Sequence, residues 1–155
     1  CCPSPFDSYL MTLGLETLSL RVRHEVESAR RLAEYCRNHP KVERVSFVGF
    51  ESHPSYANAK KYFRFGSSAV FTIELKGTLD STVRFVESLN LAAHMVMIGD
   101  SVTVVTHPAS TTHKQLGDAD LAAAGVTPTM LRISVGLENT DDLIDDFEQA
   151  FAHIG

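Results

Sequence analysis

The stretch that decides the fold is "TMLRISVGLENTDDLIDDFEQAF", residues 129–151. Its first part alternates apolar and polar residues, with Leu131, Ile133 and Val135 on one face, which is typical of a half-buried strand. Thr140 then precedes two aspartates, a combination that favours the start of a helix. We therefore expect a strand followed by a helix, each burying one side against a shared core.

The same patterns recur upstream and define the fold class. Residues 42–49 and 69–77 predict two further strands, and residues 94–108 predict one or two more, broken at Gly99-Asp100. Apolar residues at helical spacing over 79–89 indicate another helix. The predicted class is α+β: a mostly antiparallel sheet of about four strands, with helices packed on one face and a partly polar opposite face.

The chain opens with a long helical pattern. Ser4, Pro5 and Asp7 form a start signal, and the pattern runs to Asn38, roughly 50 Å at 1.5 Å per residue. A kink near Gly14 would divide it. The first half is apolar nearly all round, so we expect it to pack against something outside this chain. The expected organisation is a long linking helix over 1–40 and an α/β domain over 41–155.

Composition restricts the function classes. The 155 residues suit one domain with a real core, and no apolar run is long enough to predict a membrane span. The formal net charge of −5 argues against a nucleic-acid partner or an anionic membrane surface. Three cysteines without a C-x-x-C spacing argue against a disulfide framework and favour a reducing cytoplasm. The chain does not open with Met, so we expect an upstream part to be missing.

Arg132 is the most informative single residue. It stands in the middle of a predicted strand, on the polar face, and its planar fork suits bidentate capture of a carboxylate. The alternatives are an arginine paired with an internal glutamate and an arginine that is simply solvated. From the residues alone, the chain is an α+β domain with one arginine suited to binding an anion.

The connector "VTHPASTTH", residues 105–113, is rich in histidines and hydroxyls. The spacing of His107 and His113 matches no common metal-ligand motif, and Ser110 has no G-x-S-x-G elbow around it. We therefore predict no metal site and no catalytic nucleophile in this chain, and interpret the segment as an ordered polar connector.

Several segments together resemble one enzyme family. These are "SPFDSYLMTLGLETLSLRV", "HPKVERVSFVG", "FTIELKG", "GDSVTVVTHPASTTHKQL" and "GVTPTMLRISVGLENTDDLIDDFEQAF". In this order they resemble the C-terminal portion of the Cys/Met-metabolism pyridoxal-phosphate enzymes. Gly99-Asp100, where cystathionine enzymes commonly have Gly-Gly, is most similar to the O-acetylhomoserine sulfhydrylase branch. The other branches are cystathionine γ-synthase, the cystathionine lyases and methionine γ-lyase.

The resemblance implies a fold-type I enzyme with pyridoxal 5'-phosphate bound to a lysine of a large domain. Arg132 falls on the family arginine that binds the substrate α-carboxylate. The implied reaction replaces the acetoxy group of O-acetylhomoserine by sulfide or a thiol, in a homo-oligomer, dimer or tetramer. Further residues expected to line the pocket are Met97, Gly99, Asp100, His107, Ser110, Thr111 and Thr112.

Two departures from the family pattern affect these expectations. None of the lysines stands in the family's lysine motif, so the chain by itself is predicted to lack the cofactor attachment site and to be inactive. Met97 replaces a polar residue that the family usually places near the substrate carboxylate, which puts the substrate in question. A different class of function is also open: a stand-alone module that binds an amino-acid carboxylate through Arg132.

Overall fold

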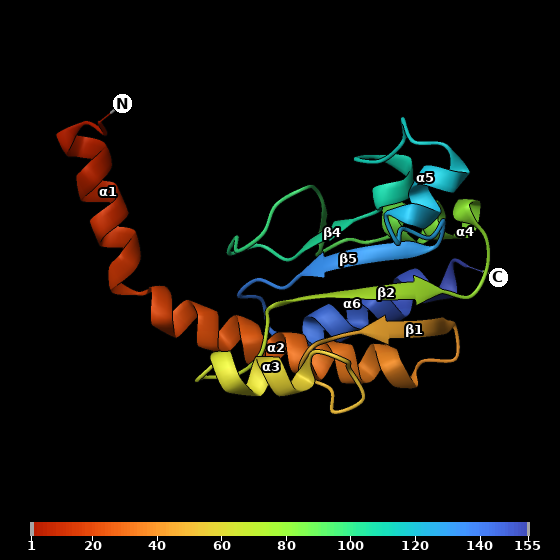
Figure 1. Ribbon diagram of the computed structural model, residues 1–155, viewed down its shortest axis with the longest axis horizontal. Coiled ribbons are helices and arrows are strands. Elements are labelled where there is room, and N and C mark those ends of the chain that lie inside the picture. Colours follow the sequence, from red (N-terminus) through yellow and green to blue (C-terminus); the bar gives the residue numbers. More distant parts are fainter. Residues whose placement is uncertain (1, 155) are drawn as a thin grey trace.

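The computed structural model describes residues 2–154, apart from the side chain of residue 118. The strand and helix predicted over residues 129–151 are both present, as β5 and α6. The elements, in chain order, are α1 (Pro5–Glu16), α2 (Leu18–Asn38), β1 (Val42–Ser46), α3 (Tyr56–Tyr62), β2 (Val70–Leu75), α4 (Leu79–Glu87), β3 (Ala93–His94), β4 (Val104–Thr106), the 3-10 helix η1 (Pro108–Ser110), α5 (Asp118–Ala123), β5 (Met130–Ser134) and α6 (Thr140–Ala152) (Figure 1).

The strands form one sheet in the order β1-β2-β5-β4-β3. Neighbours are antiparallel except β3 and β4, which run parallel. The α+β class is confirmed. The expected mostly antiparallel sheet of about four strands is confirmed only in part, because the sheet has five strands and the β3–β4 pair makes it mixed. The chain leaves the sheet after His94, and the Met95 carbonyl accepts a hydrogen bond from the Thr106 hydroxyl at 2.6 Å instead of continuing the ladder.

Helices cover one face of the sheet. α2 packs on β1, β2 and α6, and α4 packs on α6. In Figure 1, α6 runs behind the sheet, and the middle of the sheet faces the viewer uncovered. The core between these layers includes Phe71, Ile73, Leu131, Ile133 and Phe147, all at most 2% exposed. The apolar positions of β2 and β5 therefore point at the helices, and their polar positions form the open face.

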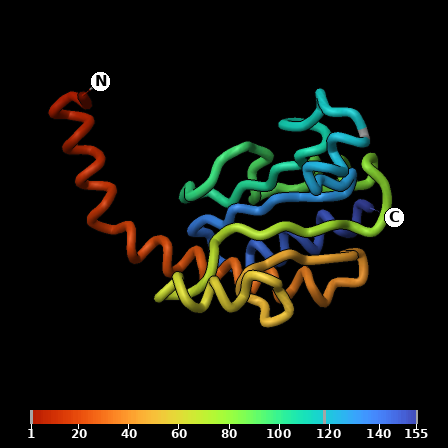
Figure 2. The backbone as a smooth tube through the Cα atoms, viewed as in Figure 1, coloured from red at the N-terminus to blue at the C-terminus, as the bar shows by residue number. Residues whose placement is uncertain are grey.

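The long opening helix is broken, but at Thr17 rather than near Gly14. Thr17 ends α1 and precedes α2 with φ −107° and ψ 1°, and its carbonyl accepts from the Leu20 amide at 3.1 Å. Gly14 lies inside α1. Figure 2 shows α1 extending away from the rest of the chain, and none of its residues is buried. No helix within the described residues is both long and apolar enough to cross a membrane.

Candidate functional site

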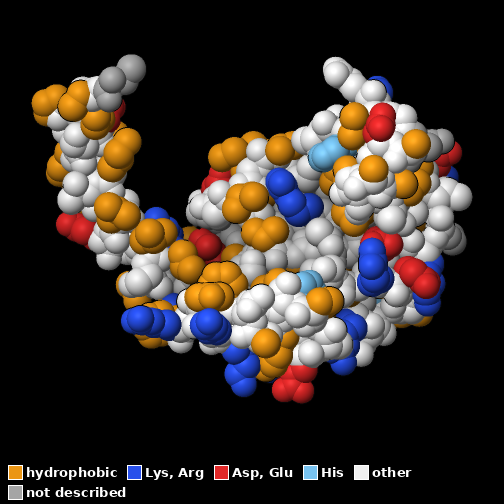
Figure 3. Space-filling view, viewed as in Figure 1, with side chains coloured by type: hydrophobic (Ala, Val, Ile, Leu, Met, Phe, Trp, Pro, Cys, Tyr) orange, Lys and Arg blue, Asp and Glu red, His pale blue; other side chains and the backbone are white. Residues whose placement is uncertain are grey.

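A row of polar side chains crosses the open face of the sheet. The register pairs Arg132 of β5 with Thr72 of β2 on one side and with Thr106 of β4 on the other, and Thr72 pairs with Ser46 of β1. Directly opposed residues of neighbouring strands share a face, so these four side chains lie side by side. In Figure 3 the middle of this face is hollowed and mostly white, the colour of uncharged polar side chains and backbone.

Arg132 is held by neutral oxygens and not by an acid. Its Nη2 donates to the Met97 carbonyl at 3.3 Å and to the Thr106 hydroxyl at 3.2 Å. Its Nε is buried and finds no acceptor among the described residues. Within residues 2–154, Arg132 forms no ion pair with a carboxylate, so it is not the internally paired arginine that the sequence left open. The partly exposed guanidinium therefore has no counter-ion within the described residues, and an anionic oxygen would supply one.

The segment after β3 brings one of the predicted residues, Met97, to this arginine and another, Gly99, to Ser134 of the same strand. Met97 contributes its backbone carbonyl, while its side chain is about half exposed. Gly99 adopts φ +75°, a conformation that favours glycine, and its amide donates to the Ser134 hydroxyl at 3.3 Å. Asp100 closes its own turn, since its carboxylate accepts from the Val102 amide at 3.4 Å. The segment therefore lies along β5 through backbone groups.

His107 of the polar connector is buried and hydrogen-bonds within the fold. His107 is 1% exposed, and its Nε2 donates to the Pro128 carbonyl at 2.9 Å. Because a neutral ring has one donor nitrogen, Nδ1 accepts from the Ser110 hydroxyl, at 2.8 Å. Burial, and secondarily the charge of His94, lower the pKa of His107, while the Pro128 carbonyl opposes the shift.

The remaining connector residues bond to their neighbours. The Thr111 hydroxyl donates to the His107 carbonyl at 2.7 Å, and the exposed Thr112 hydroxyl lies 2.8 Å from His113 Nδ1. His107 and Ser110 line a small cavity of about 50 Å³ beside α4. Of the connector residues expected to line the pocket, none of His107, Ser110, Thr111 and Thr112 hydrogen-bonds to Arg132 in the described part of the chain.

Sequence reasoning missed Thr106 as a partner of Arg132. It is 1% exposed, and its hydroxyl bonds both to the Met95 carbonyl and to Arg132. The alternation of side chains along a strand predicts only that Thr106 lies on the other face of the sheet from Val105. The register that sets it beside Arg132 depends on which strands are neighbours, and that is not visible in the pattern.

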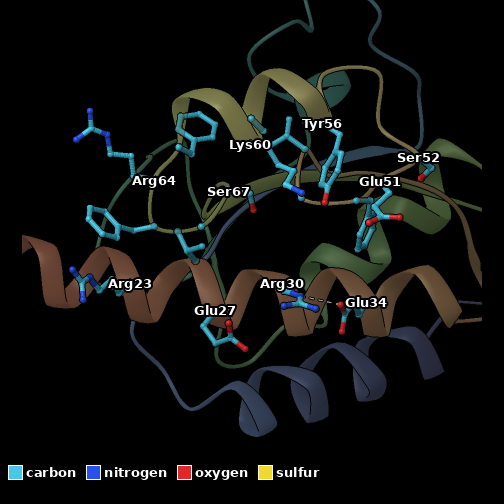
Figure 4. Close-up of a pocket in the computed structure, with 18 of the residues that line it drawn as sticks. Arg23, Glu27, Arg30, Glu34, Glu51, Ser52, Tyr56, Lys60, Arg64 and Ser67 are labelled. Carbon is cyan, nitrogen blue, oxygen red and sulfur yellow. Dashed lines mark hydrogen bonds and ion pairs between the residues drawn. The ribbon is translucent and has the colours of Figure 1, made fainter.

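A larger groove lies elsewhere, between α2 and the segment that carries α3. This groove has a volume of about 900 Å³ and does not include Arg132. In Figure 4, Tyr56 and Lys60 project from α3 toward α2, where Arg30 pairs with Glu34 at 3.1 Å. No buried, unpartnered polar atom belongs to the described lining residues of this groove. The open sheet face around Arg132 is therefore the stronger candidate for a binding site.

Comparison with known proteins agrees with the resemblance seen in the sequence. The family model described as Cys/Met metabolism PLP-dependent enzyme matches residues 1–152. Homocysteine synthase of Schizosaccharomyces pombe is 46% identical over 95% of this chain and 34% of its own length. O-acetyl-L-homoserine sulfhydrylase 1 of Thermus thermophilus is 43% identical over 96% of this chain and 35% of its own.

A solved structure is similar throughout the chain. The O-acetylhomoserine (thiol)-lyase of Campylobacter jejuni, described as putative and carrying a pyridoxyl-lysine phosphate at its position 205, superposes with a TM-score of 0.87 at 35% identity. The match covers 96% of this chain and 35% of that one. The chain thus spans about a third of the length of the proteins that it matches.

Proposed function

Because this chain belongs to the Cys/Met-metabolism PLP-dependent enzyme family, we propose that it is part of an O-acetylhomoserine sulfhydrylase in which Arg132 binds the α-carboxylate of the substrate. The observation that carries the proposal is that Arg132, on the open sheet face, has no carboxylate partner among the described residues. A substrate carboxylate would supply that counter-ion, and the pairing fixes the orientation of the amino acid as well as its affinity.

The lysines of this chain do not fit the attachment of pyridoxal phosphate. Lys41 Nζ donates to the Phe151 carbonyl at 2.7 Å at the end of α6, and Lys76 Nζ donates to the Pro40 carbonyl at 2.9 Å. Lys60 and Lys61 lie on α3, each over a tyrosine ring. Lys114 is exposed beyond the polar connector.

The proposed enzyme therefore divides its work between two domains. Residues 41–155 form a C-terminal domain that binds the substrate carboxylate, and residues 1–40 link it to a large domain that holds the cofactor. Pyridoxal phosphate acts as an electron sink in the chemistry that exchanges acetate for sulfide or a thiol. The whole protein is a cytoplasmic homo-oligomer, a dimer or tetramer, in this proposal. Residues 1–155 by themselves are expected to release no acetate.

The test is acetate release from O-acetylhomoserine and sulfide by the full-length protein. We expect Arg132→Ala to raise KM for O-acetylhomoserine roughly 100-fold, because a charge-assisted pair is worth about 1.5–3 kcal/mol per hydrogen bond. Arg84→Ala, which removes an exposed arginine of α4, is the matched control and should leave KM unchanged.

Three outcomes contradict the proposal. Release of an α-keto acid from methionine or cystathionine without acetate release would assign the protein to a lyase branch of the same family. Calorimetric binding of an amino acid to residues 1–155 alone, abolished by Arg132→Ala, would favour the stand-alone binding module. An unchanged KM in Arg132→Ala would remove the carboxylate role altogether.

A further inference from the structure

The two hydrogen bonds of the Thr106 hydroxyl can be assigned donor and acceptor roles in only one way. It is buried and lies 2.6 Å from the Met95 carbonyl and 3.2 Å from Arg132 Nη2. A carbonyl only accepts and a guanidinium only donates, so the single hydroxyl hydrogen points to Met95 and a lone pair points to Arg132. Thr106 therefore joins the arginine to the segment that follows β3.

This segment also supplies the second acceptor for the same nitrogen. Arg132 Nη2 donates to the Met97 carbonyl at 3.3 Å, two residues beyond the carbonyl that Thr106 holds. Thr106 thus accepts a hydrogen bond from the guanidinium. It also bonds to the backbone segment that carries the second acceptor of Arg132, the Met97 carbonyl. The register of β4 on β5 places Thr106 opposite Arg132, on a strand whose three residues are all buried.

We infer that Thr106 is a positioning residue, which holds the Arg132 guanidinium in one orientation so that its remaining donors face the substrate carboxylate. The inference rests on the proposed function. An arginine side chain loses up to about 2 kcal/mol of rotamer entropy when it is fixed, so an arginine that is already fixed binds more tightly. Met97 offers Arg132 its carbonyl, and Thr106 supplies the side-chain hydroxyl bonded to Arg132 within the described residues.

The experiment compares Thr106→Val and Thr106→Ser in the full-length protein. Valine keeps the shape but removes both hydrogen bonds. We therefore expect KM for O-acetylhomoserine to rise roughly 10-fold while kcat stays within about 2-fold, because the lost binding is the same in the ground state and the transition state. Serine keeps the hydroxyl and should restore KM. Thr82→Val is the matched control, since it removes a buried hydroxyl of α4 that donates to the carbonyl of the capping residue Thr78 at 3.0 Å, away from Arg132.

The outcomes separate this inference from the proposed function. If Arg132→Ala raises KM and Thr106→Val does not, Thr106 has no positioning role and the proposed function stands. If both Thr106→Val and Thr82→Val lower Tm and raise KM, the effect belongs to folding and the inference is overturned. If Arg132→Ala leaves KM unchanged, the proposed function fails first.

Discussion

At the scale of single residues, His107 shows how the polar connector is stabilised. Its neutral ring uses both nitrogens, donating to the Pro128 carbonyl and accepting from Ser110. A second proton on Nδ1 would face the Ser110 hydroxyl oxygen and require that hydroxyl to turn. Burial lowers the pKa of His107, which is the direction expected for a ring held neutral.

The stability of the chain should therefore fall on acidification. The folded-state pKa of His107 lies below its unfolded value of about 6.5, so its contribution is complete above that pH and is lost as pH falls through the folded pKa. The slope reaches at most about 1.4 kcal/mol per pH unit for one proton. Urea unfolding across pH 7.5 to 4.5 measures it, with His107→Gln showing a smaller slope.

His39 needs its own control in this experiment. Burial lowers its pKa too, with Glu148 opposing the shift and Lys41 adding to it. The variant His39→Gln should remove a separate part of the pH dependence, and the double variant should remove both parts. An unchanged slope in His107→Gln would show that the connector histidine is not the group that titrates.

At the scale of elements, the polar face could be predicted and its internal contacts could not. Alternation in "TMLRISVG" correctly put Arg132 opposite Leu131 and Ile133, because period-2 patterning follows from strand geometry. β3 has two residues, too few for any periodicity to show. The helix break also escaped prediction: glycine suggested Gly14, but the break at Thr17 comes from backbone dihedrals that no residue preference marks.

Asp146 of α6 is a second feature that the pattern could not reveal. It is 5% exposed, and its carboxylate accepts the amides of Asn90, Leu91 and Ala92 at 2.7, 3.1 and 2.9 Å. These amides belong to the turn between α4 and β3, so one side chain fixes the entry into β3. Its acidic neighbours in sequence concealed this role, since a charge run usually marks a solvated face.

Removing this carboxylate should destabilise the fold. Asp146→Ala leaves backbone donors without an acceptor, and we expect the free energy of unfolding to fall by about 2–4 kcal/mol. Asp146→Asn keeps one acceptor oxygen and should fall between the wild type and Asp146→Ala. Urea unfolding is the measurement, with the exposed Asp145→Ala as control. Equal stability of Asp145→Ala and Asp146→Ala would contradict the assigned role.

At the scale of the whole molecule, α1 is the part that the rest of the chain does not stabilise. It has 12 residues and none is buried, although a helix of this length is marginal in water without tertiary packing. Its capping box at Ser4 and Asp7 stabilises the first turn only. Its exposed large apolar residues are Phe6, Tyr9, Leu10, Met11, Leu13 and Leu15.

This surface should make residues 1–155 self-associate when the chain is studied alone. Phe6, Leu10 and Leu13 follow helical spacing along one face, and covering them removes apolar area from water at about 25 cal/mol per Å². Sedimentation velocity over a concentration series should show association that Leu10→Asp abolishes. Ser8→Asp adds the same charge away from that face and should leave association intact. A chain that stays monomeric throughout the series, or that dissociates equally with Ser8→Asp, would show that α1 does not drive association.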